Sequence, residues 1–309
     1  MTIHLVLGTG AVGASLANLL ATQGHTVRVV NRSGNRGALN AAIPLIQADV
    51  SDPAAAASAI AGADLVYQVT QPAYAKWASE FPALQRSILG AAEQTGARVV
   101  LADNLYCYRP QPGAIITEDT PERPLTRKGT VRKAMADEAL AAHAAGRVRV
   151  ALTRPSNYIG GDYALFRSLV LDPITKGKAA RVLGRTDRPH SFSFVSDAAR
   201  AMATIGTSDK GWGRAWITPV MAPITQAELI ARLWEASGQS GKPKVSAIRG
   251  AGMRALSLFM PILRESLEMM YEFDEPFVAS SAEFEAAFGW GATSWDDAVA
   301  KMVAAQMLA

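Results

Sequence analysis

Several features are scarce in this sequence, and each scarcity excludes a class of protein. The chain has one cysteine, Cys107, so an intrachain disulfide is excluded and a reducing compartment is favoured. No secretory signal pattern precedes the first apolar run, and a cytoplasmic location is therefore predicted. The longest later apolar run, residues 255–263, contains Pro261 and is too short to span a bilayer. We therefore expect no membrane association.

The clusters that mark metal and nucleic-acid sites are also missing. The chain has four histidines, and no group of Cys, His or Asp has metal-ligand spacing, so no metal is expected. The net charge of +4 is spread over scattered Lys and Arg residues, which argues against nucleic-acid binding. With 309 residues, 49% of them hydrophobic, the chain can form one large domain or two smaller ones. The expected partner is a small-molecule substrate.

A glycine-rich motif, G-x-G-x-x-G, stands at residues 8–13. It follows an apolar strand that begins at Ile3, and it precedes a helical pattern that ends at Gly24. A dinucleotide site requires this order of strand, turn and helix, in which the glycines allow the tight turn, the approach of a pyrophosphate and close helix packing. The free N–H groups of the helix then face the phosphates, although an ordinary glycine-rich turn is the alternative. The expected cofactor residues here are Gly8, Thr9, Gly10, Ala11, Val12 and Gly13.

The end of the second predicted strand, residues 26–30, bears on the choice of cofactor. NAD sites usually carry a carboxylate there for the ribose 2′-hydroxyl, whereas this chain has Asn31 and Arg32. A guanidinium can grip a 2′-phosphate, so NADP(H) is favoured over NAD(H), unless Arg32 is only a solvated loop residue. A third short strand, residues 44–50, ends beside the expected adenine position. The residues expected at this end of the cofactor are Asn31, Arg32, Ser33, Asp49 and Val50.

Strand and helix patterns continue to alternate as far as residue 152. The apolar runs 63–69, 97–102 and 148–152 are predicted strands, and residues 53–63 and 131–145 are predicted helices. This repeated βα pattern predicts an α/β fold with a doubly wound parallel sheet, a Rossmann fold. Ligands of such sheets lie at the carboxyl ends of the strands. The further cofactor residues expected there are Thr70, Gln71, Pro72, Pro155 and Asn157.

Beyond residue 161 the pattern loosens. Residues 1–161 are predicted to form the Rossmann NADP(H)-binding domain, with 190–206 returning to it. Residues 162–309, including a strand over 212–218, are expected to form mainly a smaller α/β lobe that binds the substrate and closes a cleft. A stripe of apolar residues at helical spacing, 256–271, is expected in the core of this lobe. The sharper alternative is that Met260, Met269, Met270 and Tyr271 wall an apolar substrate pocket.

Four segments together resemble the extended short-chain dehydrogenase/reductase family, also called NAD-dependent epimerases/dehydratases. They are the glycine motif, R-P-S-N-Y-I-G at residues 154–160, residues 190–201, and F-G-W at residues 288–290. Their order covers most of the chain, although Leu7 stands where the family has its first glycine. The resemblance implies a Ser or Thr after the fifth strand and a Tyr-x-x-x-Lys pair on the next helix. In the family the Tyr transfers a proton, the Lys lowers its pKa, and the Ser or Thr positions the substrate oxygen.

This chain departs from the family at that catalytic signature, because it contains no Tyr-x-x-x-Lys. Aligning Tyr108 with the family's V-Y-G places Asn104 at the Ser/Thr position. Aligning Gly129 with the glycine after the catalytic Tyr places Lys128 at the Tyr position and Arg132 at the Lys position. The expected catalytic residues are therefore Asn104 and Lys128, with Tyr106 and Tyr158 as further candidates.

Several interpretations of this departure stay open. A reductase could use Lys128, its pKa lowered by Arg132 or Lys133, as in NmrA-like and isoflavone-reductase-like relatives that also lack the Tyr. Alternatively, the chain binds NADP(H) without turnover as a sensor or scaffold, or it is a sugar-nucleotide epimerase or dehydratase. The three basic residues could also be a solvated helix face, and His190 is interpreted as structural. The leading hypothesis is hydride transfer with a small carbonyl or alcohol substrate. The resemblance also implies a homodimer through residues 79–96 and 131–145.

Overall fold

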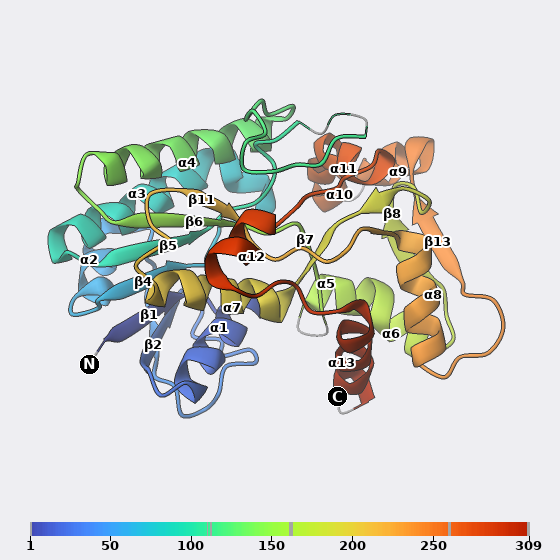
Figure 1. Cartoon of the computed structure of the whole chain (residues 1–309), viewed down its shortest axis with the longest axis horizontal. Coiled ribbons are helices and arrows are strands. Elements are labelled where there is room, and N and C mark those ends of the chain that lie inside the picture. Colours follow the sequence, from blue (N-terminus) through green and yellow to red (C-terminus); the bar gives the residue numbers. More distant parts are fainter. Residues whose placement is uncertain (1, 110, 112, 161–162, 259–260, 308–309) are drawn as a thin grey trace.

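The computed structural model describes residues 2–307 apart from 110, 112, 161–162 and 259–260, and it forms a sheet domain beside a smaller lobe (Figure 1). The sheet has seven parallel strands in the order β3-β2-β1-β4-β5-β6-β11. The predicted doubly wound parallel sheet is therefore confirmed. The strands are β1 (Ile3–Leu7), β2 (Thr26–Asn31), β3 (Leu45–Gln47), β4 (Leu65–Gln68), β5 (Arg98–Ala102), β6 (Val150–Arg154) and β11 (Ala215–Ile217).

Alternate residues of the strands face two separate apolar cores. Leu5 and Leu7 pack beneath α2 (Pro53–Ile60), α3 (Trp77–Thr95) and α4 (Arg127–Ala144). Val6 faces the opposite layer, formed by α1 (Ala11–Thr22) and α7 (Val195–Thr207), which pack against each other. Burial on both faces explains why the strands read as continuous apolar runs.

The strand order reverses between β1 and β4. The chain runs outward from β1 to β3 and then crosses back to β4, so the connections after β1 and β4 diverge. A crevice opens at such a switch point, beside the carboxyl ends of the strands. The fold thus positions the glycine motif after β1 next to the loop after β4.

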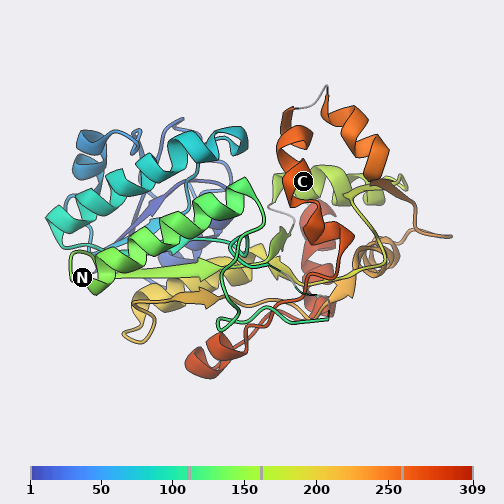
Figure 2. The ribbon, with the colours of Figure 1, turned by 90° about the horizontal axis from the view of Figure 1, so that it is seen from above.

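Helices α3 and α4 lie side by side on the outer face of the sheet domain (Figure 2). The exposed guanidinium of Arg86 on α3 pairs with Glu138 on α4 at 2.7 Å. The homodimer expected through residues 79–96 and 131–145 stays a prediction.

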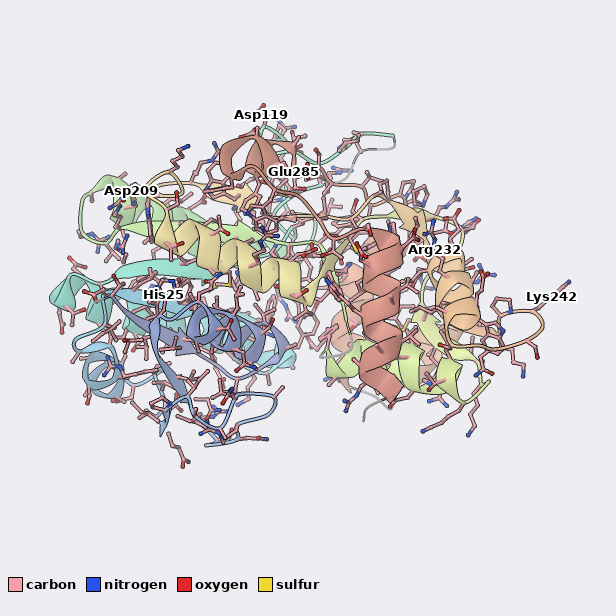
Figure 3. The ribbon with its side chains drawn as sticks, turned by 60° about the horizontal axis from the view of Figure 1, so that its bottom comes forward. His25, Asp119, Asp209, Arg232, Lys242 and Glu285 are labelled. Atoms are coloured by element: carbon pink, nitrogen blue, oxygen red, sulfur yellow. The ribbon has the colours of Figure 1, made fainter. Side chains whose placement is uncertain are left out.

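The smaller lobe has its own apolar core, to which α8 and α13 contribute Leu229, Leu233 and Met302. Arg232 on α8, labelled in Figure 3, pairs with Asp296 on α13 at 3.4 Å. No helix among the described residues is long and apolar enough to cross a membrane. The helices here are α5 (Ala164–Phe166), α6 (Asp172–Thr175), α8 (Gln226–Ala236), α9 (Gly250–Ser257), α10 (Pro261–Ser266), α11 (Tyr271–Asp274) and α13 (Trp295–Met307), with a π-turn η2 (Arg167–Leu171) and a 3-10 turn η3 (Leu267–Met269).

Three short two-stranded sheets complete the fold. One of them joins the segment after β6 to the segment before α7, because Asn157–Ile159 (β7) pairs in parallel with Phe192–Phe194 (β10). The others pair β9 (Pro189–His190) with β12 (Ile224–Thr225), and β8 (Ala180–Leu183) with β13 (Val245–Ile248). A 3-10 turn, η1 (Tyr74–Lys76), precedes α3.

One segment was assigned to the wrong part of the molecule. Residues 212–218 were expected in the smaller lobe, but β11 extends the central sheet beside β6. Helix α12 (Ala282–Phe288) covers it, with the Trp216 ring 5.2 Å from that of Phe288. A strand of three residues is too short for its sequence pattern to reveal which sheet it joins, although α7 precedes it. The expected boundary between residues 161 and 162 lies outside the described residues.

Candidate functional site

The glycine turn after β1 has little room for side chains. Gly8 has a φ of +118°, and a Cβ there would lie 3.1 Å from the Thr70 backbone nitrogen. At Gly13 a Cβ would lie 2.2 Å from the Gly8 carbonyl oxygen, so only glycine lets α1 approach the strand this closely. Gly10, the N-cap of α1, has no side-chain cap, and the space where its Cβ would stand is open. The helix therefore presents uncapped N–H groups, which suit a pyrophosphate.

A cavity of about 360 Å³ opens in front of this helix end. We call it the first cavity. Its wall runs from the start of α1 through the loops after β4, β5 and β6, and Glu272 of α11 closes it from the smaller lobe. The structure thus brings together many of the residues that the sequence predicted. Those that line the cavity are Gly10, Ala11, Val12, Gly13, Thr70, Gln71, Asn104, Tyr106, Pro155, Asn157 and Tyr158.

The residues expected at the adenine end lie outside this cavity. Asn31 donates to the Thr9 hydroxyl at 2.6 Å and accepts from the Gly34 N–H at 2.7 Å, so it ties the end of β2 to the glycine turn. Arg32 follows with its side chain 77% exposed, 3.9 Å from the Asp49 carboxylate. The predicted residues that do not line the cavity are Gly8, Thr9, Asn31, Arg32, Ser33, Asp49, Val50, Pro72 and Lys128.

At the expected adenine end of the cofactor site, Arg36 and Asp49 are already engaged by other residues. The Arg36 guanidinium donates to the carbonyl oxygens of Asn40 and Ile43 at 2.8 and 2.6 Å, which closes its own loop. Hydrogen bonds from Ser51 hold the pKa of Asp49 below its usual value, and the Arg32 charge adds to this. Of the two arginines, Arg32 is the one whose side chain is left exposed, next to Asn31 at the end of β2.

A buried ionic network fixes the loops after β5 and β6. Asp103 accepts from the Arg132 guanidinium at 2.6 Å and from Arg154 Nε at 2.8 Å. Burial alone would raise the pKa of Asp103, but the two guanidinium groups hold it below its usual value. Arg154 also donates to the Tyr108 hydroxyl at 2.7 Å. Arg132, at the position of the family's catalytic Lys, is therefore committed to Asp103.

The surroundings of Lys128 differ from both sequence predictions, namely a cationic neighbour or a solvated helix face. It is 2% exposed, so the solvated helix face was wrong for this residue. Its ammonium donates to Glu265 at 2.6 Å and to Glu268 at 2.9 Å, and it lies 4.5 Å from the centre of the Tyr74 ring. The expected cationic neighbour is therefore replaced by two carboxylates, each paired with the ammonium. A catalytic role for Lys128 stays a prediction.

A second cavity of about 380 Å³ extends into the smaller lobe. Most of its wall is apolar and comes from residues 163–192 and 229–230, together with Ile159 and Met269. Met270 and Tyr271 line neither cavity, so only part of the expected methionine wall exists, and Met260 lies outside the described residues. Seven residues line both cavities and mark their junction: Gln71, Tyr74, Tyr106, Asn157, Tyr158, Tyr163 and Glu272.

Three junction residues were not predicted from the sequence, namely Tyr74, Tyr163 and Glu272, and Glu272 is the acidic one. Its side chain is buried, with 2% exposed, and its carboxylate accepts from the Asn157 amide at 3.1 Å. Burial raises the pKa of Glu272 to about 8, although the Asn157 hydrogen bond acts in the opposite direction. A single acidic residue between Met269, Met270, Tyr271 and Phe273 is the signal that could have identified it.

The His190 ring contacts the Glu272 backbone and the Asn157 amide. Its Nδ1 lies 3.0 Å from the Glu272 backbone oxygen, and its Nε2 lies 3.1 Å from the Asn157 amide nitrogen. A carbonyl oxygen can only accept, so Nδ1 carries the hydrogen and Nε2 accepts from Asn157. Burial lowers the pKa of His190 to about 4, which keeps the ring neutral. These contacts agree with the structural interpretation of His190.

The tyrosines at the junction are held as neutral phenols. The Tyr106 hydroxyl lies 3.5 Å from that of Tyr74, and burial raises the pKa of Tyr106 well above its usual value. Burial likewise raises the pKa of Tyr158. Asn104 uses its side-chain oxygen to accept from the Tyr106 N–H at 3.1 Å, which shapes the loop. Within the described ranges, no group of three or more metal-ligating side chains could hold an ion.

The family model for the NAD dependent epimerase/dehydratase family matches residues 4–215 of this chain. That range includes the glycine turn, which lines the first cavity. It also includes the loops after β4, β5 and β6, which line both cavities. No curated protein sequence matches the chain.

Solved structures share the fold at low sequence identity. UDP-glucose 4-epimerase from Thermotoga maritima, solved with UDP-glucose, has a TM-score of 0.81 and 15% identity, with 99% of each chain covered. dTDP-glucose 4,6-dehydratase from Streptomyces venezuelae, solved with NAD, has a TM-score of 0.80 and 18% identity, with 99% of this chain and 97% of that chain covered. UDP-glucose 4-epimerase from Thermus thermophilus, in complex with NAD, has a TM-score of 0.77 and 17% identity, with 98% of each chain covered.

Proposed function

The chain belongs to the NAD-dependent epimerase/dehydratase family, and on that basis we propose that it is an NADP(H)-dependent oxidoreductase. Its substrate in this proposal is a small, largely apolar carbonyl compound or the corresponding alcohol. The observation that carries the proposal is the junction of the two cavities, where the loops after β4, β5 and β6 meet α11. A redox cofactor and a substrate must touch at one place, and this junction offers one.

The first cavity fits the cofactor. Gly13 lets α1 lie close to β1, and the uncapped N–H groups beside Gly10 can hold a pyrophosphate. Two of the solved relatives contain NAD, which supports a nicotinamide cofactor. Bound there, the cofactor supplies a hydride to a carbonyl carbon or removes one from an alcohol carbon. The exposed Arg32 side chain, which follows the end of β2, favours the 2′-phosphate of NADP(H).

The second cavity fits a small apolar substrate. Leu169, Phe192 and Leu229 belong to its wall, and a volume of about 380 Å³ suits a small molecule. The Asn104 amide nitrogen has no partner among the described residues, so it can donate to the substrate oxygen. The chain's own residues would thus bury the apolar part of the substrate, exclude water and orient one polar group.

Sugar-nucleotide chemistry is the second candidate, because the solved relatives act on or contain sugar nucleotides. A diphosphate requires cationic or N–H donors. In the described wall of the second cavity Arg181 is the one cation, and the remaining wall is mostly apolar. The balance of charge therefore favours the apolar carbonyl substrate.

The test measures binding first and turnover second. We expect the protein to bind NADPH more tightly than NADH, and Arg32→Ala to weaken NADPH binding about tenfold while leaving NADH unchanged. We then expect NADPH oxidation with a panel of apolar ketones, aldehydes and enones, and none with UDP-glucose or dTDP-glucose. Tight NADPH binding without turnover of any panel member would contradict the enzyme and favour a sensor. An Arg32→Ala variant with an unchanged preference would contradict the NADP(H) assignment.

A further inference from the structure

We propose that Glu272, supplied by the smaller lobe, is the catalytic residue that gives the substrate oxygen its proton. The inference rests on the proposed oxidoreductase function and adds the group that the missing Tyr-x-x-x-Lys leaves unassigned. A carboxyl group thereby performs the task that the family assigns to a phenol on the helix after the fifth strand.

The geometry points to Glu272 because it lies at the meeting point of both cavities. It lines the first and the second cavity, and its side chain is 2% exposed. The Asn157 amide holds Oε2 at 3.1 Å, and the His190 ring holds the backbone carbonyl at 3.0 Å. Since Oε2 accepts from an N–H group, Oε1 is the oxygen that carries the proton of the neutral carboxyl. These contacts fix the carboxyl group in the wall of the junction, beside the place where a substrate carbonyl group would meet the cofactor.

Among the described residues, no cation forms an ion pair with this carboxyl group. Arg132 of α4 and Arg154 of β6 are both paired with Asp103, which follows β5. Lys128 of α4 is paired with Glu265 of α10 and with Glu268 of η3.

The remaining neighbours of Glu272 are neutral. Tyr74 from η1, Tyr106 from the loop after β5 and Tyr271 from α11 are phenols whose pKa values burial raises. His190, from β9, is a neutral ring. Without a paired cation, burial raises the pKa of Glu272 to about 8, so the carboxyl carries its proton at neutral pH.

A proton donor works best when its pKa is close to the operating pH. Glu272 meets that condition, whereas burial moves the pKa values of Tyr106 and Tyr158 away from it. Asn104 lacks a transferable proton and can only position the substrate oxygen. Among the described junction residues Glu272 is therefore the best proton donor.

The proposed step balances in both directions. When the carbonyl carbon receives the hydride from the reduced nicotinamide, the O–H bond of Glu272 breaks and a new O–H bond forms on the substrate oxygen. The products are the alcohol, the oxidised cofactor and the Glu272 carboxylate, which regains a proton from water. In the oxidative direction, the carboxylate removes the proton of the alcohol while the carbon loses its hydride.

The test compares Glu272→Gln with Glu275→Gln, the same chemical change three residues along the chain on an exposed side chain. We expect Glu272→Gln to lower kcat for the best carbonyl of the panel at least a hundredfold, with an unchanged Kd for NADPH. We expect Glu275→Gln to match the wild type. The wild-type reduction rate should fall as the pH rises through about 8, and any residual rate of Glu272→Gln should not.

A second measurement needs neither substrate nor cofactor. Infrared difference spectra of the wild-type protein should contain the C=O band of a protonated carboxyl group at pH 7 that disappears as the pH rises through about 8. Glu272→Gln should lack this band, and Glu275→Gln should retain it. Wild-type turnover and pH dependence in Glu272→Gln, or a wild-type spectrum without this band, would overturn the proposal. A wild-type protein that binds NADPH but reduces no carbonyl would overturn the oxidoreductase function itself.

Discussion

Gly10 and Gly13 stand in the same turn, but a methyl group has opposite consequences at the two positions. At Gly13 the added Cβ would meet the Gly8 carbonyl at 2.2 Å and Val69 at 2.8 Å. We expect Gly13→Ala to destabilise the fold by about 3 kcal/mol, which outweighs the gain of about 1 kcal/mol in helix propensity. At Gly10 nothing lies within 4 Å and φ is −65°, so Gly10→Ala should fold normally.

The Gly10→Ala variant should nonetheless bind cofactor at least tenfold more weakly, because its methyl group points into open space at the cavity wall. Thermal denaturation measures the first effect and fluorescence titration with NADPH measures the second. Equal melting temperatures for the two variants would contradict the packing role of Gly13. Wild-type affinity in Gly10→Ala would contradict the pyrophosphate position.

At the scale of residues, the sequence predicts the sites whose residues are close together along the chain. The glycine turn could be predicted because its six residues are consecutive, and their spacing reflects one strand, one turn and one helix. Glu272 could not, because it meets Asn157 across 115 positions and only the folded lobe brings them together. The same applies to Lys128, whose partners Glu265 and Glu268 lie 137 and 140 positions away.

At the scale of elements, Lys128 connects α4 of the sheet domain with α10 and η3 of the smaller lobe. Replacing it by Gln would leave two partly buried carboxylates without their cation. We expect Lys128→Gln to destabilise the protein by roughly 1–3 kcal/mol, less than for a fully buried pair because the Glu265 and Glu268 side chains are 14% and 24% exposed. Amide exchange of residues 263–274 should accelerate.

The triple variant Lys128→Gln/Glu265→Gln/Glu268→Gln should recover much of that stability, because it removes the unpaired charges as well. Its activity distinguishes a connecting role from a catalytic one. If Lys128 only holds the lobe, the triple variant should regain turnover with its stability. A triple variant that is stable but inactive would instead support Lys128 as the proton donor.

The elements differ in how well the sequence predicts them, and burial is the reason. Strands such as β4 and β6 are buried on both faces, so their apolar runs stand out. β11 is three residues long, and its place beside β6 depends on α12 covering it from far along the chain. The stripe at residues 256–271 suggested a helix, but the described chain breaks there into α9, α10 and η3, with Pro261 opening α10.

At the scale of the whole molecule, the sheet domain and the smaller lobe meet at the junction of the two cavities. Figure 3 shows His25 at the end of the sheet domain opposite to Lys242 of the smaller lobe. His4, beside His25 with 4.5 Å between the ring centres, lies in β1 and outside both cavities. His4 thus lies in the sheet, whereas His190 and Glu272 are in contact at the junction. Together they determine how stability depends on pH.

Two buried histidines make the protein more stable as the pH rises from acid. Burial lowers the pKa of His4 and of His190 from 6.5 to about 4. Between these values the unfolded chain binds more protons than the folded one, so the free energy of unfolding rises with pH. Burial of Glu272 has the opposite effect, because its pKa is 4.5 in the unfolded chain and about 8 in the fold. Between pH 4.5 and 8 the folded protein therefore binds more protons at this site and loses stability as the pH rises.

The two effects predict a stability maximum near pH 6.5. There the two histidines are each half protonated in the unfolded chain, and their combined effect on the slope cancels that of Glu272. From pH 6.5 to 8 we expect the free energy of unfolding to fall by up to about 1.4 kcal/mol per pH unit. The Cys107 thiol, whose pKa burial raises from 9.0, adds a further decline only at higher pH. Urea denaturation at a series of pH values measures this. Glu272→Gln should abolish the decline while Glu275→Gln retains it, and equal slopes in the two variants would show that Glu272 does not carry a proton in the folded protein at neutral pH.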